Sequence, residues 1–164
     1  MAPSWSRAPR PLGALLLAVG LALLTACPGI KNVNPFTQHI TLQPLAGGSY
    51  SGYSRTTFGQ RIPAGKKLYL RSATITSSTG EFTWATSLTG AASPDAGAQV
   101  LVSKPSFEGA ERTTELDVVD TGDILPLYPD QDFRVYWSLQ YASTLTQAYP
   151  DGVTLDVTYE LEMD

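Results

Sequence analysis

Apolar and polar residues alternate along most of the chain after residue 37. The two clearest stretches are 132–143 and 153–162, where nearly every second residue is apolar. Alternation with a period of two is typical of a β-strand with one buried and one solvent-exposed face. The expected inward residues of the first stretch are Phe133, Val135, Trp137, Leu139 and Tyr141. Those of the second are Val153, Leu155, Val157, Tyr159 and Leu161.

Shorter segments of the same kind occupy the rest of this region. Strands are predicted at 38–44, 67–77, 81–88, 98–103 and 112–119, and the polar, aromatic segment 50–58 is predicted to be an irregular or edge strand. Within 67–77 the apolar residues change parity between Leu70 and Ala73. An extra residue near Arg71 and Ser72 would bring them onto one face, which predicts a β-bulge there.

The region after residue 37 shows no sustained helical period, and turn residues recur at roughly ten-residue spacing. This pattern predicts an all-β domain over residues 37–164, built as a single antiparallel β-sandwich of about eight strands. Alternation and turns do not distinguish a jelly-roll from an immunoglobulin-like topology. The strand at 153–162 has five inward apolar residues, so we expect it to lie centrally.

The first 27 residues have a different pattern. Arg7 and Arg10 give a basic start without acidic residues, and the uncharged run 12–24 (LGALLLAVGLALL) follows. This arrangement is typical of the helix of a secretory signal peptide. The run of 13 residues is short, because a transmembrane helix needs about 20 apolar residues.

The run ends in Leu24, Thr25 and Ala26, followed by Cys27, the single cysteine of the chain. This ending resembles the lipobox of bacterial lipoproteins. The resemblance implies that the Cys27 thiol receives a diacylglyceryl group carrying palmitate-like chains. Signal peptidase II would recognise Leu24, Thr25 and Ala26, and cut before Cys27. The alternatives are an ordinary signal peptide with an incidental cysteine, or an uncleaved anchor.

The resemblance divides the chain into a lipoprotein signal peptide (1–26), a lipidated tether (27–36) and the β-domain (37–164). Two or three acyl chains hold a protein stably on a bilayer, so the membrane is the expected partner of Cys27. In this family an aspartate after the cysteine is the usual signal for retention at the inner membrane. Pro28 stands there instead, which favours the outer membrane or the cell surface of a bacterial envelope.

Charge excludes one class of partner. The chain has 11 Lys+Arg and 15 Asp+Glu, and removing Arg7 and Arg10 with the signal peptide leaves 9 basic residues against 15. Nucleic-acid binding needs a basic surface, so we expect no nucleic-acid partner. The same balance predicts no overall attraction to anionic lipids, and leaves anchoring to the acyl chains.

No catalytic motif stands out, and the protein is predicted not to be an enzyme. His39 is the single histidine, so a Ser-His-Asp or histidine–metal mechanism would have to use it. The chain has no Gly-x-Ser-x-Gly motif and no paired histidines. A histidine at an edge strand is the simpler interpretation.

Four carboxylates lie in one connection, at Asp120, Asp123, Asp130 and Asp132. Calcium takes six to eight oxygen ligands, so this segment is a candidate Ca²⁺ site, although its spacing differs from an EF-hand. Capping of turns is the alternative role of such residues. No other cofactor is expected.

Aromatic residues offer the remaining candidate site. Trp84 and Trp137 have inward parity and are expected in the core. Tyr136 is predicted to face outward beside Arg134, and Tyr50 and Tyr53 lie in a polar segment, so these four are the candidate binding residues: Tyr50, Tyr53, Arg134 and Tyr136. The sequence thus favours a non-catalytic envelope lipoprotein that binds a protein or envelope component. The alternative is a carbohydrate-binding module that uses the outward aromatics.

Overall fold

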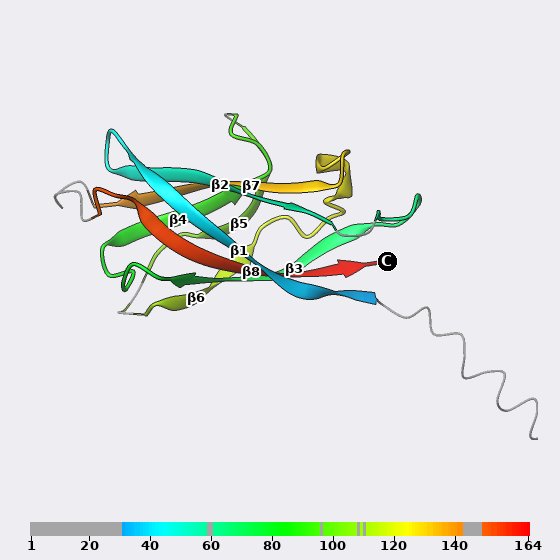
Figure 1. Cartoon of the computed structure of the whole chain (residues 1–164), viewed down its shortest axis with the longest axis horizontal. Coiled ribbons are helices and arrows are strands. Elements are labelled where there is room, and N and C mark those ends of the chain that lie inside the picture. The colour runs from blue at the N-terminus through cyan, green and yellow to red at the C-terminus, as the bar shows by residue number, and fades with distance from the viewer. Residues whose placement is uncertain (1–30, 59–60, 96, 108, 110, 143–148) are drawn as a thin grey trace, which may run out of the picture.

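A computed structural model describes residues 31–58, 61–95, 97–107, 109, 111–142 and 149–164, with side chains from residue 35 onward. The predicted signal peptide and Cys27 lie outside these residues. The described chain is built from the following elements: β1 (Lys31–Leu45), β2 (Ser49–Thr57), β3 (Leu68–Ser77), β4 (Ala85–Ala91), β5 (Val100–Lys104), β6 (Thr113–Val118), the 3-10 turn η1 (Leu125–Leu127), β7 (Asp132–Tyr141) and β8 (Val153–Met163) (Figure 1).

The strands form one closed antiparallel barrel in the order β1-β2-β7-β4-β5-β6-β3-β8. Their pairing is nested along the chain, because β1 pairs with β8, β2 with β7, β3 with β6 and β4 with β5. Strand β3 therefore lies beside β6, the last strand of the β4-β5-β6 meander. This is a Greek-key connection.

The predicted antiparallel β-sandwich is wrong because the sheet closes on itself into a barrel. Strand β1 has 15 residues, and its first part pairs with β8 from Lys31 to Leu42. Its last three residues pair instead with β2, from Gln43 to Leu45. On the other side, Val102 of β5 pairs with Val118 of β6. The alternation of apolar and polar residues shows which residues face inward. Closure into a barrel also depends on how far neighbouring strands are shifted along one another, and alternation does not show this shift.

The predicted tether of residues 27–36 also needs correction. Strand β1 begins at Lys31, opposite Met163, and Phe36 lies opposite Tyr159. The rings of Phe36 and Tyr159 are stacked, with centroids 5.2 Å apart. Residues 31–36 therefore belong to the barrel rather than to a tether.

The strongest strand predictions are confirmed. The predicted inward residues of β8 are all buried, as are those of β7 up to Leu139, while Tyr141 is half-buried. Strand β8 pairs on both sides, with β1 and β3. The β3–β8 register shifts between Leu70 and Ser72, which is the predicted bulge.

The segment around β4 differs from its prediction. The strand begins only at Ala85, so Phe82 and Trp84 pack from the preceding turn. Thr86 is exposed, although it is two residues from the buried Leu88. The register of β4 against β7 shifts between Ala85 and Ser87, and this irregularity breaks the simple parity.

The barrel interior is filled by large side chains. The largest fully buried ones are Trp137, Tyr50, Tyr159, Phe82 and Phe133. Ring pairs such as Phe133–Tyr159, at 5.1 Å, connect opposite walls. Helices within the described residues are too short or too polar to span a bilayer.

Candidate binding face

The outer face of β2, β7 and β4 carries two of the three tyrosine candidates, Tyr53 and Tyr136. Tyr53 of β2 lies directly opposite Tyr136 of β7, and Ala91 of β4 lies on the other side of Tyr136. Because alternate residues of a strand share a face, Ser51 and Arg55 point the same way as Tyr53. We call this surface the tyrosine face.

Tyr53 and Tyr136 form a pair at the centre of the tyrosine face. Their ring centroids are 6.0 Å apart and their planes are inclined at 34°. The side chain of Tyr53 is 63% exposed, and Tyr136 is half-buried. The two rings line a hollow of about 570 Å³, together with Ser51, Ser138 and Pro94. This volume is within the range of about 300–1,000 Å³ that is usual for small-ligand sites.

The β4–β5 connection forms one wall of this hollow. Its described residues include Ser93, Pro94 and Asp95, all of which line the hollow. The Ser93 hydroxyl donates to Asp95 Oδ2 at 2.7 Å, and the Asp95 amide donates back to Ser93 Oγ at 3.3 Å. These reciprocal bonds hold a carboxylate at the rim.

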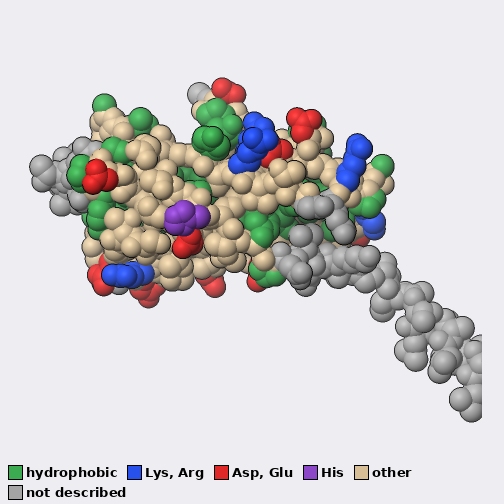
Figure 2. All heavy atoms as spheres, in the orientation of Figure 1, with side chains coloured by type: hydrophobic (Ala, Val, Ile, Leu, Met, Phe, Trp, Pro, Cys, Tyr) green, Lys and Arg blue, Asp and Glu red, His purple; other side chains and the backbone are tan. Residues whose placement is uncertain are grey.

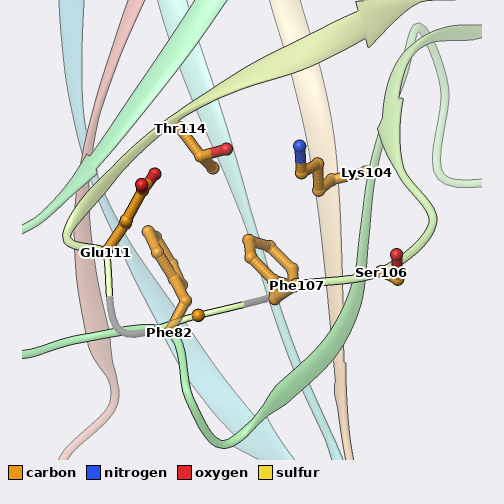
Figure 3. A pocket seen from close by; sticks show the side chains of 7 residues that line it. Phe82, Lys104, Ser106, Phe107, Glu111 and Thr114 are labelled. Atoms are coloured by element: carbon orange, nitrogen blue, oxygen red, sulfur yellow. The ribbon is translucent and has the colours of Figure 1, made fainter.

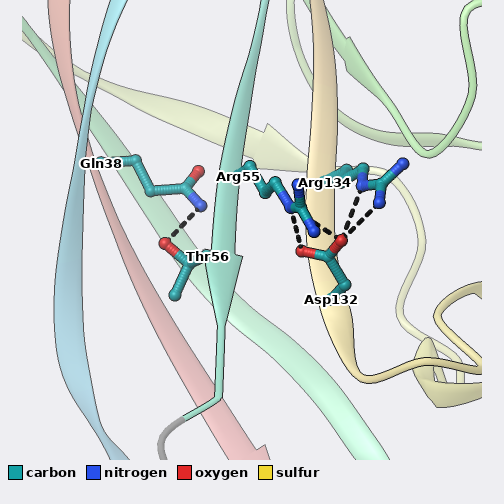
Figure 4. A network of polar contacts seen from close by, with 5 residues as sticks. All are labelled: Gln38, Arg55, Thr56, Asp132 and Arg134. Carbon is teal, nitrogen blue, oxygen red and sulfur yellow. Dashed lines mark hydrogen bonds and ion pairs between the residues drawn. The ribbon is translucent and has the colours of Figure 1, made fainter.

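Figure 4 shows a charged cluster of Arg55, Asp132 and Arg134. Arg55 and Arg134 lie two residues along β2 and β7 from Tyr53 and Tyr136, and so on the same face. Asp132 accepts a hydrogen bond from Arg55 Nε at 2.8 Å, and bonds from Arg134 Nε and Nη2 at 2.8 and 2.5 Å. The hydrogen bond from Arg55 and the bonds and charge of Arg134 hold the pKa of Asp132 below its usual range. Asp132 is therefore ionised at neutral pH, and the cluster carries one net positive charge.

The tyrosine pair and the charged cluster are continuous. A second hollow, of about 190 Å³, is lined by Tyr136, Arg134, Asp132 and Pro94. Tyr136 and Pro94 line both hollows. An aromatic surface, small hydroxyl groups and a paired carboxylate and guanidinium thus lie side by side, which suits a ligand with both flat apolar and hydrogen-bonding parts.

Tyr50 is not part of this surface, so its candidacy as a binding residue is wrong. It is fully buried, and its hydroxyl accepts a hydrogen bond from the Tyr149 amide at 3.1 Å. Tyr50 and Tyr53 are three residues apart in β2, so they point to opposite faces. Trp84, whose ring lies 5.7 Å from that of Tyr50, belongs to the same interior cluster.

The four candidate calcium ligands are not brought together. Asp123 Oδ1 accepts from the amides of Leu68 and Leu125, at 2.9 and 3.1 Å, and Asp120 Oδ1 accepts from Gly122 at 2.9 Å. Asp132 belongs to the charged cluster, and Asp130 is exposed. Across the described ranges, no three histidine, cysteine, aspartate or glutamate residues are placed to hold a metal. Two of these carboxylates cap backbone amides instead.

His39 lies on a different face, formed by β1 and β8. Its Nδ1 is 2.6 Å from Asp156 Oδ1, and its side chain is 67% exposed. Figure 2 shows the single histidine beside an acidic side chain on a surface of mostly uncharged polar groups. Within the described part of the chain, no serine or threonine hydroxyl is hydrogen-bonded to the ring, so the nucleophile of a triad is lacking there.

A third hollow, of about 320 Å³, lies at the end of the barrel away from β1's first residue. Figure 3 shows the rings of Phe82 and Phe107 side by side, with Lys104 and Glu111 on either side of them. The ring centroids are 4.8 Å apart. Its β5–β6 connection includes residues 108 and 110, which lie outside the described residues.

Sequence reasoning identified Tyr53, Tyr136 and Arg134 but missed most of the residues around them. The missed polar lining residues are Ser51, Thr89, Ser93, Asp95 and Ser138, and the other missed ones include glycines and apolar residues such as Ala91, Pro94 and Val100. Ser51 and Ser138 could have been predicted, because each lies two residues from Tyr53 or Tyr136 in the same strand and so faces outward with it. The contribution of the β4–β5 connection depends on how that loop folds back, which parity does not report.

Comparisons with protein-family models, with curated proteins and with solved structures each found no match.

Proposed function

We propose that this protein is a lipid-anchored, non-catalytic binding protein of the bacterial envelope, and that its ligand binds at the tyrosine face. The lipobox-like residues Leu24, Thr25, Ala26 and Cys27 support the anchor. The observation that carries the binding role is the Tyr53–Tyr136 pair, set in a hollow with charged groups at its edge.

The ligand that these groups favour is a saccharide of the envelope. A sugar ring presents an apolar C–H face that can stack on a tyrosine, and hydroxyl groups that need hydrogen-bond partners. Tyr53 and Tyr136 supply the flat surface, while Ser51, Ser138 and Asp95 supply polar groups. Tyrosine also adds contact area at a low cost in conformational entropy.

A binding role fits the electrostatics of the face better than hydrolysis of a saccharide. Glycosidases need a carboxyl group with a raised pKa to act as the general acid. Of the two carboxyl groups at this face, Asp95 and Asp132, the second has its pKa lowered by Arg55 and Arg134. It is therefore an acceptor of hydrogen bonds rather than a proton donor.

The ligand can be tested by calorimetry and glycan arrays that include peptidoglycan and surface-polysaccharide fragments. We expect Tyr53→Ala and Tyr136→Ala each to weaken saccharide binding at least tenfold, about 1.4 kcal/mol. Tyr69→Ala is the matched control, because Tyr69 lies on β3 beside Arg71, away from the tyrosine face. Saccharide binding that survives both face variants would refute the site. If the protein instead captures an envelope protein, does not bind saccharides, and loses the captured protein in both variants, the ligand at this face is a protein rather than a saccharide.

The anchor is tested separately by intact mass of the protein purified from bacterial membranes. We expect the mass of residues 27–164 plus acyl groups, and no acyl groups on a Cys27→Ala variant. An unmodified mass, or one that retains residues 1–26, would contradict the anchor and leave the binding face to be tested alone.

A further inference from the structure

The end of the barrel nearest to Cys27 carries a second surface with its own chemistry. Four residues of chain lead from Cys27 to Lys31, and they reach at most about 14 Å. Lys31 lies opposite Met163, and Met163 lies opposite Leu68 at the start of β3. The first residues of β1, the C-terminus and the loop before β3 therefore share one end (Figure 1). We call it the anchor end.

The loop before β3 is basic. Arg61, Lys66 and Lys67 are all exposed, and among the described residues none of the three forms an ion pair. No acidic residue occurs in the sequence between Arg55 and Glu81. Asp164 lies next to Lys67, and the hydrogen bonds described between them join backbone groups.

The tip of this loop is small and apolar. Pro63, Ala64 and Gly65 are exposed, and the Lys66 amide donates to the Pro63 carbonyl at 3.2 Å. Gly65 has a φ of 82°, which suits the third position of a type II turn. Behind the tip, a hollow of about 440 Å³ is lined by residues that include Ile62, Leu125, Tyr128 and Pro129.

The loop is held in place at some cost to the backbone. Gln131 Oε1 accepts from the Ile62 amide at 2.7 Å, and Gln131 Nε2 donates to the Ile62 carbonyl at 3.1 Å. Gln131 itself has a φ of 55°, which is uncommon for a residue other than glycine. Strain of this kind often marks a functional segment.

We propose that the loop 61–67 is a membrane-contact loop, which rests on the bilayer surface and binds the phosphates of anionic phospholipids. This inference relies on the lipid anchor of the proposed function, because the short tether brings the anchor end against the bilayer. The electrostatic attraction between a lysine or arginine and anionic lipid is strongest within a Debye length of the bilayer surface, about 8 Å at physiological salt. Local charge therefore matters more here than the net charge of the mature chain, and the three basic residues of the loop form no ion pair among the described residues.

The test uses the lipidated protein in vesicles of phosphatidylglycerol and phosphatidylcholine, with vesicles of phosphatidylcholine alone for comparison. Ala64→Cys and Ala46→Cys each introduce one free thiol for a fluorophore, because Cys27 is acylated. Ala64 is in the loop tip, and Ala46 is an exposed residue of the β1–β2 hairpin at the opposite end. Quenching by a lipid-borne quencher reports which end contacts the bilayer.

We expect the label at residue 64 to be quenched strongly on the anionic vesicles and the label at residue 46 to be unaffected. Replacing Arg61, Lys66 and Lys67 by glutamine should lower the ratio of docked to undocked orientations about fivefold per residue. Arg112→Gln, at the opposite end, should have no effect.

Flotation with the vesicles is measured in the same samples and reports the anchor alone. Protein that fails to float contradicts the lipid anchor, and with it the premise of this inference. Protein that floats but shows equal quenching at residues 64 and 46 overturns the membrane-contact loop and leaves the anchor intact. Quenching at residue 64 that is equal on both vesicle types overturns the recognition of anionic phosphate.

Discussion

Three polar side chains meet inside the mainly apolar barrel, and they give a sharp prediction about stability. The Trp137 Nε1–H group donates to Ser54 Oγ at 3.2 Å, and the Tyr159 hydroxyl lies 3.5 Å from the same oxygen. Ser54 is 3% exposed and Trp137 2%. Burial raises the pKa of Tyr159, so its hydroxyl stays neutral. Ser54 is the shared partner of both aromatic groups.

Ser54→Ala should therefore cost more than Tyr159→Phe. The alanine removes the Ser54 oxygen that accepts from the Trp137 N–H at a buried site, and an unsatisfied buried donor costs about 1–3 kcal/mol. Tyr159→Phe removes the polar group together with its need for a partner. The bond that it loses is at the long limit for a hydrogen bond, so we expect a loss of about 1 kcal/mol or less in the free energy of unfolding.

Urea denaturation of the purified variants, followed by tryptophan fluorescence, measures both losses. Ser51→Ala is the matched control, because Ser51 lies on the outward face of the same strand, and surface changes stay within about 0.5 kcal/mol. The denaturant slope should be unchanged if only the native state is affected. A Tyr159→Phe variant that is destabilised as much as Ser54→Ala would refute this account of the interior.

Two further predictions concern the tyrosine face and its floor. Hydrogen bonds from Arg55 and Arg134 lower the pKa of Asp132 in the folded state. The ionised Asp132 carboxylate therefore stabilises the fold above its unfolded pKa of about 3.9, and this stabilisation is lost as the pH falls through the folded pKa. Asp132→Asn should lower Tm at neutral pH and flatten its fall in acid, which thermal melts across pH will show. A Cβ on Gly90 would lie 2.8 Å from Val102 Cγ2. Gly90→Ala should therefore cost about 1–3 kcal/mol of overpacking in the urea assay, and an unchanged midpoint would contradict the contact.

The sequence predicted best where one face of a strand is uniformly apolar. Strands β7 and β8 satisfy this condition, and so does β3 once its bulge is allowed for. Strand β2 does not, because two of its inward positions are Ser54 and Thr56, and it was taken for an irregular or edge strand. Those polar residues are satisfied inside the barrel, Ser54 by Trp137 and Thr56 by Gln38. The sequence around an inward-facing polar residue does not show which hydrogen-bond partner that residue has in the folded protein.

Closure of the barrel and the composition of the site could not be read from the same pattern. Closure between β1 and β2 depends on where β1 stops pairing with β8 and starts pairing with β2. Either partner leaves the same residues of β1 facing inward, so the alternation does not show where the change occurs. The tyrosine face depends on the β2–β7 register, which places Tyr53 opposite Tyr136. Tyr50 is different, since its odd spacing from Tyr53 already argued for the opposite face.

The two proposed surfaces together restrict the kind of ligand that the protein can reach. Tyr53 precedes the end of β2 at Thr57 by four residues, which is about 13 Å along a strand, and β2 ends toward the loop 61–67. With Cys27 only four residues before β1, the tether adds at most about 14 Å. In the proposed lipid-anchored protein the tyrosine face is therefore held near the bilayer, and it lies on the side of the barrel rather than at its anchor end. A saccharide polymer that runs close to the membrane surface could pass along this side, whereas one confined far above the bilayer would lie beyond the protein's reach.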